Sequence, residues 1–194
     1  MTRSLRRRRH VAILLTLTAL SVESGLPARA AQQAQGQART RVSIVAGKWH
    51  INGQVTYPGA RAQGLLMNVR MVNSTFEDRN KRDFDPDANT ERFIAKIPGY
   101  AASGVRAFTL NLQGGMPGYE GALNSAFYAD GSLREEYLAR MARVIEACDR
   151  NGVAVILGCY YQRQSGVLKD DDAIRAGVVN AVNWLRRRQY ANVV

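Results

Sequence analysis

The sequence predicts an α/β fold in which the strands of a parallel sheet alternate with amphipathic helices. Three apolar runs of strand length recur at intervals of roughly 40 residues, and a fourth begins at the C-terminus: 65–72, 105–112, 153–160 and 192–194. Near-continuous apolar strands are typical of a parallel sheet that helices cover. The segments between them show helical periodicity, so each strand–helix–strand step predicts a right-handed βαβ unit.

Two short segments precede the first parallel strand. Residues 31–41 contain almost nothing apolar beyond alanine and predict a flexible linker. Residues 42–63 predict an N-terminal β-hairpin, because they alternate weakly between apolar and polar side chains and contain the turn signal Asn52-Gly53. We expect this hairpin to lead into the parallel sheet or to close its lower end.

Three helices are predicted between the strands. The first covers about 90–103 and is expected to kink at Pro98. The second follows a capping box formed by Ser132 and Glu135, and its apolar stripe comprises Tyr137, Leu138, Met141, Val144, Ile145 and Cys148. The third opens at 170–172, with a predicted apolar face of Ile174, Val178, Ala181, Val182 and Leu185.

The first 30 residues predict export. Four arginines at 6–9 precede an uncharged apolar run at 11–22, and the small residues Ala28 and Ala30 suit a signal-peptidase site after Ala30. The run of 12 residues is shorter than the roughly 20 that span a bilayer. We therefore expect 1–30 to be a signal peptide cleaved after Ala30, and a secreted or periplasmic protein with no stable membrane anchor. An N-terminal anchor is the alternative reading of this pattern.

Charge and metal-ligating residues exclude several classes of function. The net charge of +11 falls to +6 without residues 1–30, and the remaining basic residues form no stripe interleaved with aromatic rings. We therefore expect no nucleic-acid partner. The alternating acids at 83–91 resemble a calcium loop, but its glycine and final glutamate positions hold Ala88 and Ile94. With His50 alone in the mature chain, we expect no metal and no cofactor, and two unlinked thiols at Cys148 and Cys159.

A doubly wound sheet and a (β/α)₈ barrel both fit this strand–helix rhythm. No Gly-x-Gly-x-x-Gly motif follows the first strand, and polar residues at the strand ends favour the barrel. A full barrel needs about 250 residues. We therefore expect 64–194 to be the N-terminal half of a (β/α)₈ barrel, with three βα units and the start of strand four.

Polar side chains mark the carboxyl ends of these strands, where barrel active sites lie. On the second strand Thr109, Asn111 and Gln113 share one face, opposite three apolar residues. Amides, an arginine and tyrosines suit the hydroxyls and flat faces of sugars. The predicted substrate-binding residues are Arg70, Asn73, Asn111, Gln113, Tyr160 and Tyr161. The alternative is that these groups hydrogen-bond one another and the loops.

Four motifs, at 64–73, 108–115, 124–133 and 155–158, resemble a group of secreted bacterial proteins described as cellulase-like glycoside hydrolases. The resemblance runs from about Trp49 to Val194 and implies a (β/α)₈ barrel of the retaining clan. It also implies two catalytic glutamates, one after strand four and one after strand seven. Neither is present, so catalytic residues are expected only after Val194.

The resemblance therefore leaves three interpretations. A complete protein would hydrolyse glycosidic bonds of a poly- or oligosaccharide by a retaining mechanism. Alternatively, the chain is a non-catalytic carbohydrate-binding or surface protein, or an inactive gene fragment. We expect a carbohydrate partner in the first two cases, whereas enzymatic activity is expected only of a complete barrel.

Overall fold

The computed structural model describes residues 40–78, 83–114 and 124–194. The predicted signal peptide at 1–30 and most of the predicted linker lie outside these residues. Within the described ranges, none of the helices combines the length and the apolar character that crossing a membrane requires.

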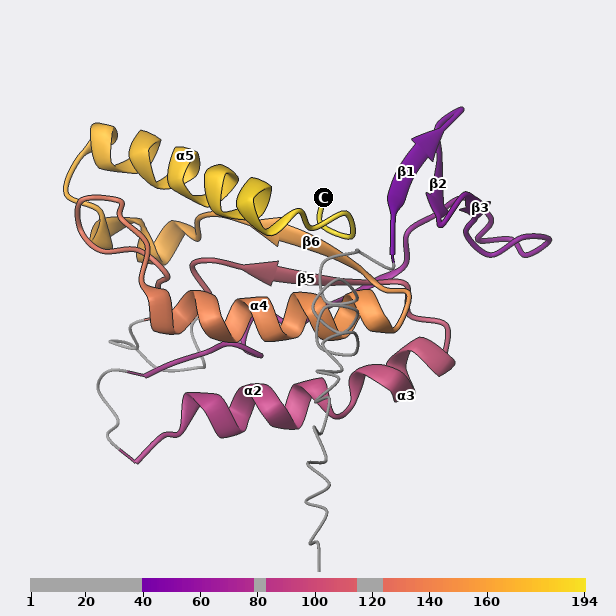
Figure 1. The fold of residues 1–194 in the computed structure, drawn as a ribbon, viewed down its shortest axis with the longest axis horizontal. Helices are drawn as coiled ribbons and strands as arrows, with labels where there is room; N and C mark the ends of the chain where they lie inside the picture. The colour runs from indigo at the N-terminus through magenta and orange to yellow at the C-terminus, as the bar shows by residue number, and fades with distance from the viewer. Residues whose placement is uncertain (1–39, 79–82, 115–123) are drawn as a thin grey trace, which may run out of the picture. The chain divides into compact units, whose positions relative to one another are not determined.

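An antiparallel sheet of three short strands comes first: β1 (Val42–Val45), β2 (Lys48–Ile51) and β3 (Gln54–Val55) (Figure 1). The predicted turn Asn52-Gly53 joins β2 to β3, and both of its residues have positive φ, as a tight hairpin turn requires. Ala46-Gly47 makes the same kind of turn between β1 and β2.

The last residues of the predicted linker are anchored to the rest of the protein. Thr40 is buried, its backbone N–H donates to Asp149 Oδ1 at 2.7 Å, and its hydroxyl donates to Asp149 O at 2.6 Å. The Arg41 N–H donates to Asn52 Oδ1 at 2.7 Å. The chain is thus held from Thr40 onward.

A parallel sheet follows, as predicted, with its strands side by side in chain order: β4 (Asn68–Arg70), β5 (Ala107–Asn111) and β6 (Ala154–Gly158). The segment at 192–194 continues this order. Val193 forms a parallel bridge with Val155, and the Leu157 N–H donates to Val194 O at 3.0 Å. Among the described residues the sheet is open, with no closed barrel.

The helices are α2 (Pro86–Ile94), α3 (Ile97–Ala102), α4 (Glu135–Arg150) and α5 (Asp171–Arg188), with a 3₁₀ turn, η1 (Gln162–Val167), before α5. The first predicted helix is therefore two helices, and it begins earlier than expected because Asp85 caps it. The predicted capping box at Ser132 is wrong. Ser132 donates to Asp130 instead, and α4 starts after Arg134.

One hydrophobic core joins these helices to one face of the parallel sheet. Phe108, Leu110 and Leu112 are fully buried there, and all six residues of the predicted α4 stripe are buried. The predicted α5 face is partly wrong, because Val178 and Val182 are exposed and the buried residues are Ala173, Gly177, Ala181 and Trp184. Both cysteines are free thiols, as predicted.

Small residues explain how α5 packs. A Cβ at Gly177 would overlap the Tyr160 hydroxyl and lie 3.2 Å from the Phe127 ring, so only glycine allows this close approach. The close approach at Gly177 therefore helps to set which side of α5 faces the core, and Val178 and Val182 remain outside.

Candidate functional site

The sheet face opposite the helices carries a row of polar side chains. Asn68 and Arg70 lie on β4, and Thr109 and Asn111 lie on β5, where Arg70 pairs in register with Thr109. The Thr109 hydroxyl donates to Asn68 Oδ1 at 2.9 Å, which links the two strands. We call these four residues the polar face. None of them is buried, whereas Phe108 and Leu110 on the other side of β5 are sealed.

Asn111 lies at the carboxyl end of β5, directly over Gly158 on β6. The two residues pair in register, and a Cβ at Gly158 would overlap Asn111 Oδ1. Glycine at this position therefore makes the space that the Asn111 amide occupies. The Tyr137 hydroxyl donates to Asn111 O at 3.4 Å and ties this strand end to α4.

Gln113 is fully buried and bonded within the protein. Its Nε2 donates to Gln164 O at 3.1 Å and to Ser125 Oγ at 3.3 Å, while its Oε1 accepts from the Tyr161 N–H at 3.3 Å. Its amide joins the loops that follow β5 and β6, as in the alternative interpretation of the polar strand ends.

Neither tyrosine joins the polar face through a hydrogen bond. The Tyr160 hydroxyl donates to Ile174 O on α5 at 2.5 Å, and its ring packs against Phe127 with centroids 5.1 Å apart. Tyr161 is half-buried, and its backbone bonds with Gln113 and Gln164. Of the six predicted residues, the structure therefore places Arg70 and Asn111 on the polar face.

Arg70 and Asn73 also line an open cleft of about 400 Å³ between β4 and α2. The Asn89 amide donates to Asn73 O at 2.9 Å and to Ser74 O at 3.3 Å, which holds the strand end against the helix. The remaining walls come from Met71, Val72, Ser74, Asn89, Arg92, Phe93, Lys96 and Tyr100. No strand-end pattern in the sequence marks Asn89, Arg92 and Lys96, so these residues were not predicted as site residues.

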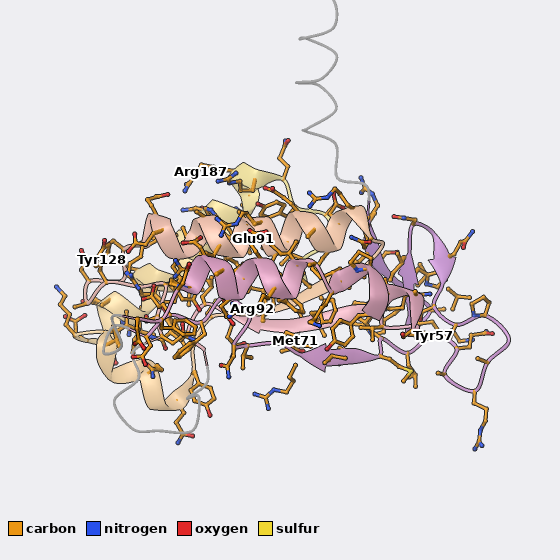
Figure 2. All side chains as sticks on the ribbon, turned by 90° about the horizontal axis from the view of Figure 1, so that it is seen from below. Tyr57, Met71, Glu91, Arg92, Tyr128 and Arg187 are labelled. Atoms are coloured by element: carbon orange, nitrogen blue, oxygen red, sulfur yellow. The ribbon has the colours of Figure 1, made fainter. Side chains whose placement is uncertain are left out.

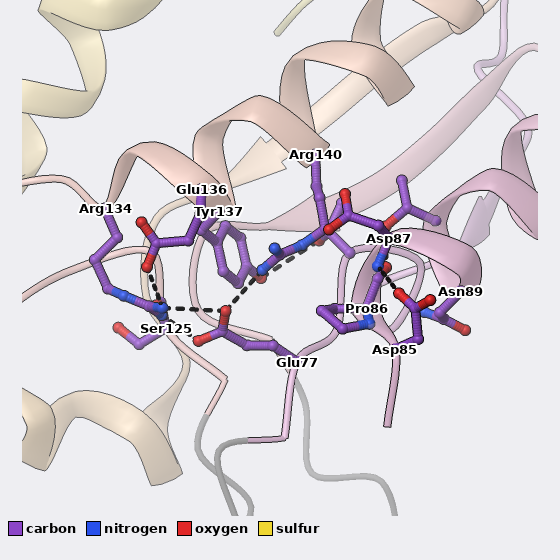
Figure 3. Close-up of polar contacts among 12 residues, drawn as sticks. Glu77, Asp85, Pro86, Asp87, Asn89, Ser125, Arg134, Glu136, Tyr137 and Arg140 are labelled. Carbon is purple, nitrogen blue, oxygen red and sulfur yellow. Dashed lines mark hydrogen bonds and ion pairs between the residues drawn. The ribbon is translucent and has the colours of Figure 1, made fainter. Parts of the chain in front are cut away.

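A buried cluster of ion pairs, which we call the clamp, holds the loop after β4 (Figure 3). Glu77 lies between Arg134 and Arg140, and all three residues are no more than 6% exposed. The Arg140 guanidinium donates to Glu77 Oε2 at 2.7 Å. Arg134 pairs with both Glu77 oxygens and with Glu136. Burial lowers the pKa of Arg134, but the hydrogen bonds and charges of Glu77 and Glu136 outweigh burial and raise it.

Tyr137 connects this clamp to the polar face. It accepts a hydrogen bond from the Thr75 hydroxyl at 3.3 Å and donates to Asn111 O. Burial raises the pKa of Tyr137 to about 12, so the phenol stays protonated as a donor at neutral pH. The loop after β4 and the end of β5 are therefore held in one arrangement.

Asn124 is a further polar residue near the strand ends. It is fully buried, its amide lies against Gly114, and neither of its amide atoms has a hydrogen-bond partner among the residues that the structure describes. Within the described residues no group of three or more His, Cys, Asp or Glu side chains could hold a metal ion.

No protein-family model and no curated protein matches this chain. Among solved structures, it is similar to a β-mannanase from the blue mussel Mytilus edulis, with 13% identity and a TM-score of 0.47. The match covers 80% of this chain and 44% of that one, so the chain spans less than half of that structure.

Proposed function

We propose that the polar face binds carbohydrate, at the carboxyl ends of the strands of a (β/α)₈-type barrel. The observation that carries this proposal is the contrast across β5, where Thr109 and Asn111 lie on the side away from the core. Carboxamide, hydroxyl and guanidinium groups supply the donors and acceptors that sugar hydroxyls require.

The arrangement of the sheet supports the barrel. The strands β4, β5 and β6 are parallel and follow chain order, and residues of α2, α4 and α5 share one core with a single face of this sheet. A doubly wound sheet reverses its strand order and has helices on both faces. A barrel keeps its helices outside and its polar strand ends at one mouth.

Within this proposal Asn111, Asn73 and Arg70 contact the sugar. Gln113, Tyr160 and Tyr161 support these residues without contacting the sugar. The hydrogen bonds of Gln113 and Tyr160 join the loops after β5 and β6 to each other and to α5. An exported protein, as residues 1–30 predict, would meet extracellular glycans.

Hydrolysis with retention needs two carboxyl groups about 5–5.5 Å apart. We propose that a complete barrel of this kind supplies them from strands that follow Val194. Glu77, in the loop after β4, is held by Arg134 and Arg140. Because these ion pairs occupy the Glu77 carboxylate, they favour a second candidate function for residues 40–194, which is carbohydrate binding without turnover.

Isothermal titration of the chain with cello-, manno- and xylo-hexaose, combined with a reducing-sugar assay, tests the proposal. We expect one of these ligands to bind, and Asn111→Ala to weaken that binding by about tenfold. Asn183→Ala, at an exposed site on α5, serves as the control and should leave the affinity unchanged. Equal affinities for wild type and Asn111→Ala would contradict a role for the polar face.

A further inference from the structure

The charged side chains that the structure describes in the cleft between β4 and α2 are all positive. Arg70, Arg92 and Lys96 line it, and none of the described residues in its wall is acidic. These three side chains are exposed and form no ion pair with any residue that the structure describes. Their positive charge is therefore left without a partner around one concave surface.

The acids of α2 lie elsewhere. Asp87 and Glu91 both pair with Arg143 on α4, the latter at 2.9 Å. Figure 2 shows Glu91 on the side of α2 toward α4 and Arg92 on the side toward Met71, at the end of β4. The charges of this helix are thus sorted, with the acids used in ion pairs and the bases left at the cleft.

We propose that this cleft binds the carboxylate of an acidic saccharide, such as a uronate residue. Arginine and lysine form charge-assisted hydrogen bonds with carboxylates, and the carboxamides of Asn73 and Asn89 in the same wall suit sugar hydroxyls. The volume of about 400 Å³ lies within the range of small-ligand sites.

The inference rests on the proposed carbohydrate-binding function and names its substrate class. Arg70 belongs both to the polar face and to the cleft, so a chain bound along the polar face would reach the cleft at the end of β4. A uronate there would be selected by charge, whereas neutral sugars would contact only the polar face.

Titration with hexamers of galacturonate and of mannuronate, each compared with its uncharged methyl ester, tests this assignment. We expect an acid form to bind about tenfold more tightly than its ester. The preference should shrink between about 20 mM and about 500 mM NaCl, because salt screens exposed charges. The paired substitution Arg92→Glu/Lys96→Glu should abolish it, and the milder Arg92→Gln/Lys96→Gln should reduce it.

Arg187→Glu is the matched control, because Arg187 is an exposed basic residue on α5 and the cleft does not include it (Figure 2). We expect Arg187→Glu to keep the preference within about twofold. Circular dichroism and sedimentation velocity should show the same fold and association state for every variant.

Three outcomes would overturn the assignment. They are equal affinity for acid and ester, equal loss in Arg187→Glu, or equally tight binding of a short DNA duplex, which would mark a generic basic surface. If neutral hexasaccharides bind and the acid forms bind no more tightly than their esters, only this inference is overturned. If no saccharide binds at all, the proposed function is overturned as well.

Discussion

The two faces of β5 differ in polarity, and beyond Ala107 they also differ in burial, although their residues alternate along one strand. Phe108 meets the rings of Phe93 and Tyr100 edge to face, with centroids 5.1 and 5.5 Å apart. The Thr109 hydroxyl donates to Asn68 on the neighbouring strand, and the Asn111 amide lies over Gly158. The face of Phe108 and Leu110, which we call the sealed face, contributes stability, whereas the side chains of the polar face are not buried.

The largest expected effect lies at the clamp where the loop after β4 meets α4. Glu77→Gln would leave Arg134 and Arg140 buried without their carboxylate, and we expect a loss of about 3–5 kcal/mol in the free energy of unfolding. Urea denaturation measures it. Glu91→Gln removes a pair whose side chains are 38% and 58% exposed and should cost less than about 1 kcal/mol. Similar losses in both variants would mean that the clamp is not buried in solution.

Two substitutions on β5 compare how much its two faces contribute to the free energy of unfolding. Leu110→Ala removes a fully buried side chain and should cost about 2–5 kcal/mol. Thr109→Ala changes the adjacent residue on the polar face and loses only one hydrogen bond to Asn68, with an expected cost of about 1 kcal/mol. If both variants unfold at the same denaturant concentration, the sheet is not sealed on one side.

Alkaline pH should lower the free energy of unfolding, because two titrating groups are buried on the sealed side of the sheet. Burial raises the pKa of both Tyr137 and Cys148 to about 12, from ordinary values of 10.0 and 9.0. Since the folded state holds these protons more tightly, their stabilisation is complete below about pH 9 and is lost as the pH rises toward 12. Each group contributes a slope of up to about 1.4 kcal/mol per pH unit within its window.

Urea unfolding across this pH window checks the prediction. Tyr137→Phe and Cys148→Ala should each flatten the decline in stability, whatever their effect at neutral pH. Thr109→Ala, which removes no titrating group, should leave the decline as steep as in the wild type. An unchanged slope in both sealed-side variants would contradict the assigned cause.

The sequence predicted those parts of the fold that depend on simple periodicity. The parallel strands follow from their apolar runs, and the α4 stripe from Tyr137 to Cys148 follows from helical spacing. The α5 face did not, because a hydrophobicity pattern favours Val178 and Val182, while close packing against Phe127 and Tyr160 requires glycine at position 177.

The candidate site was predictable only in part, for a related reason. Strand parity placed Asn111 and Arg70 correctly on the polar face, since alternation is geometric. It could not show that Gln113 is bonded to two loops, or that Glu77 is buried, because glutamate is almost never buried unless it is paired. Such partners come from α4 and η1, far away in the sequence.

The measurement that tests the central claim most directly is an amide NMR titration of ¹⁵N-labelled protein. The ligands are cello-, manno- and xylo-hexaose, together with hexagalacturonate. The account predicts that a bound sugar shifts the amide signals of 68–73 and 109–113, with small changes on α4 and α5. Shifts confined to β1–β3 or α5, or no shifts with any of the four, would contradict the claim that the polar face of the parallel sheet binds carbohydrate.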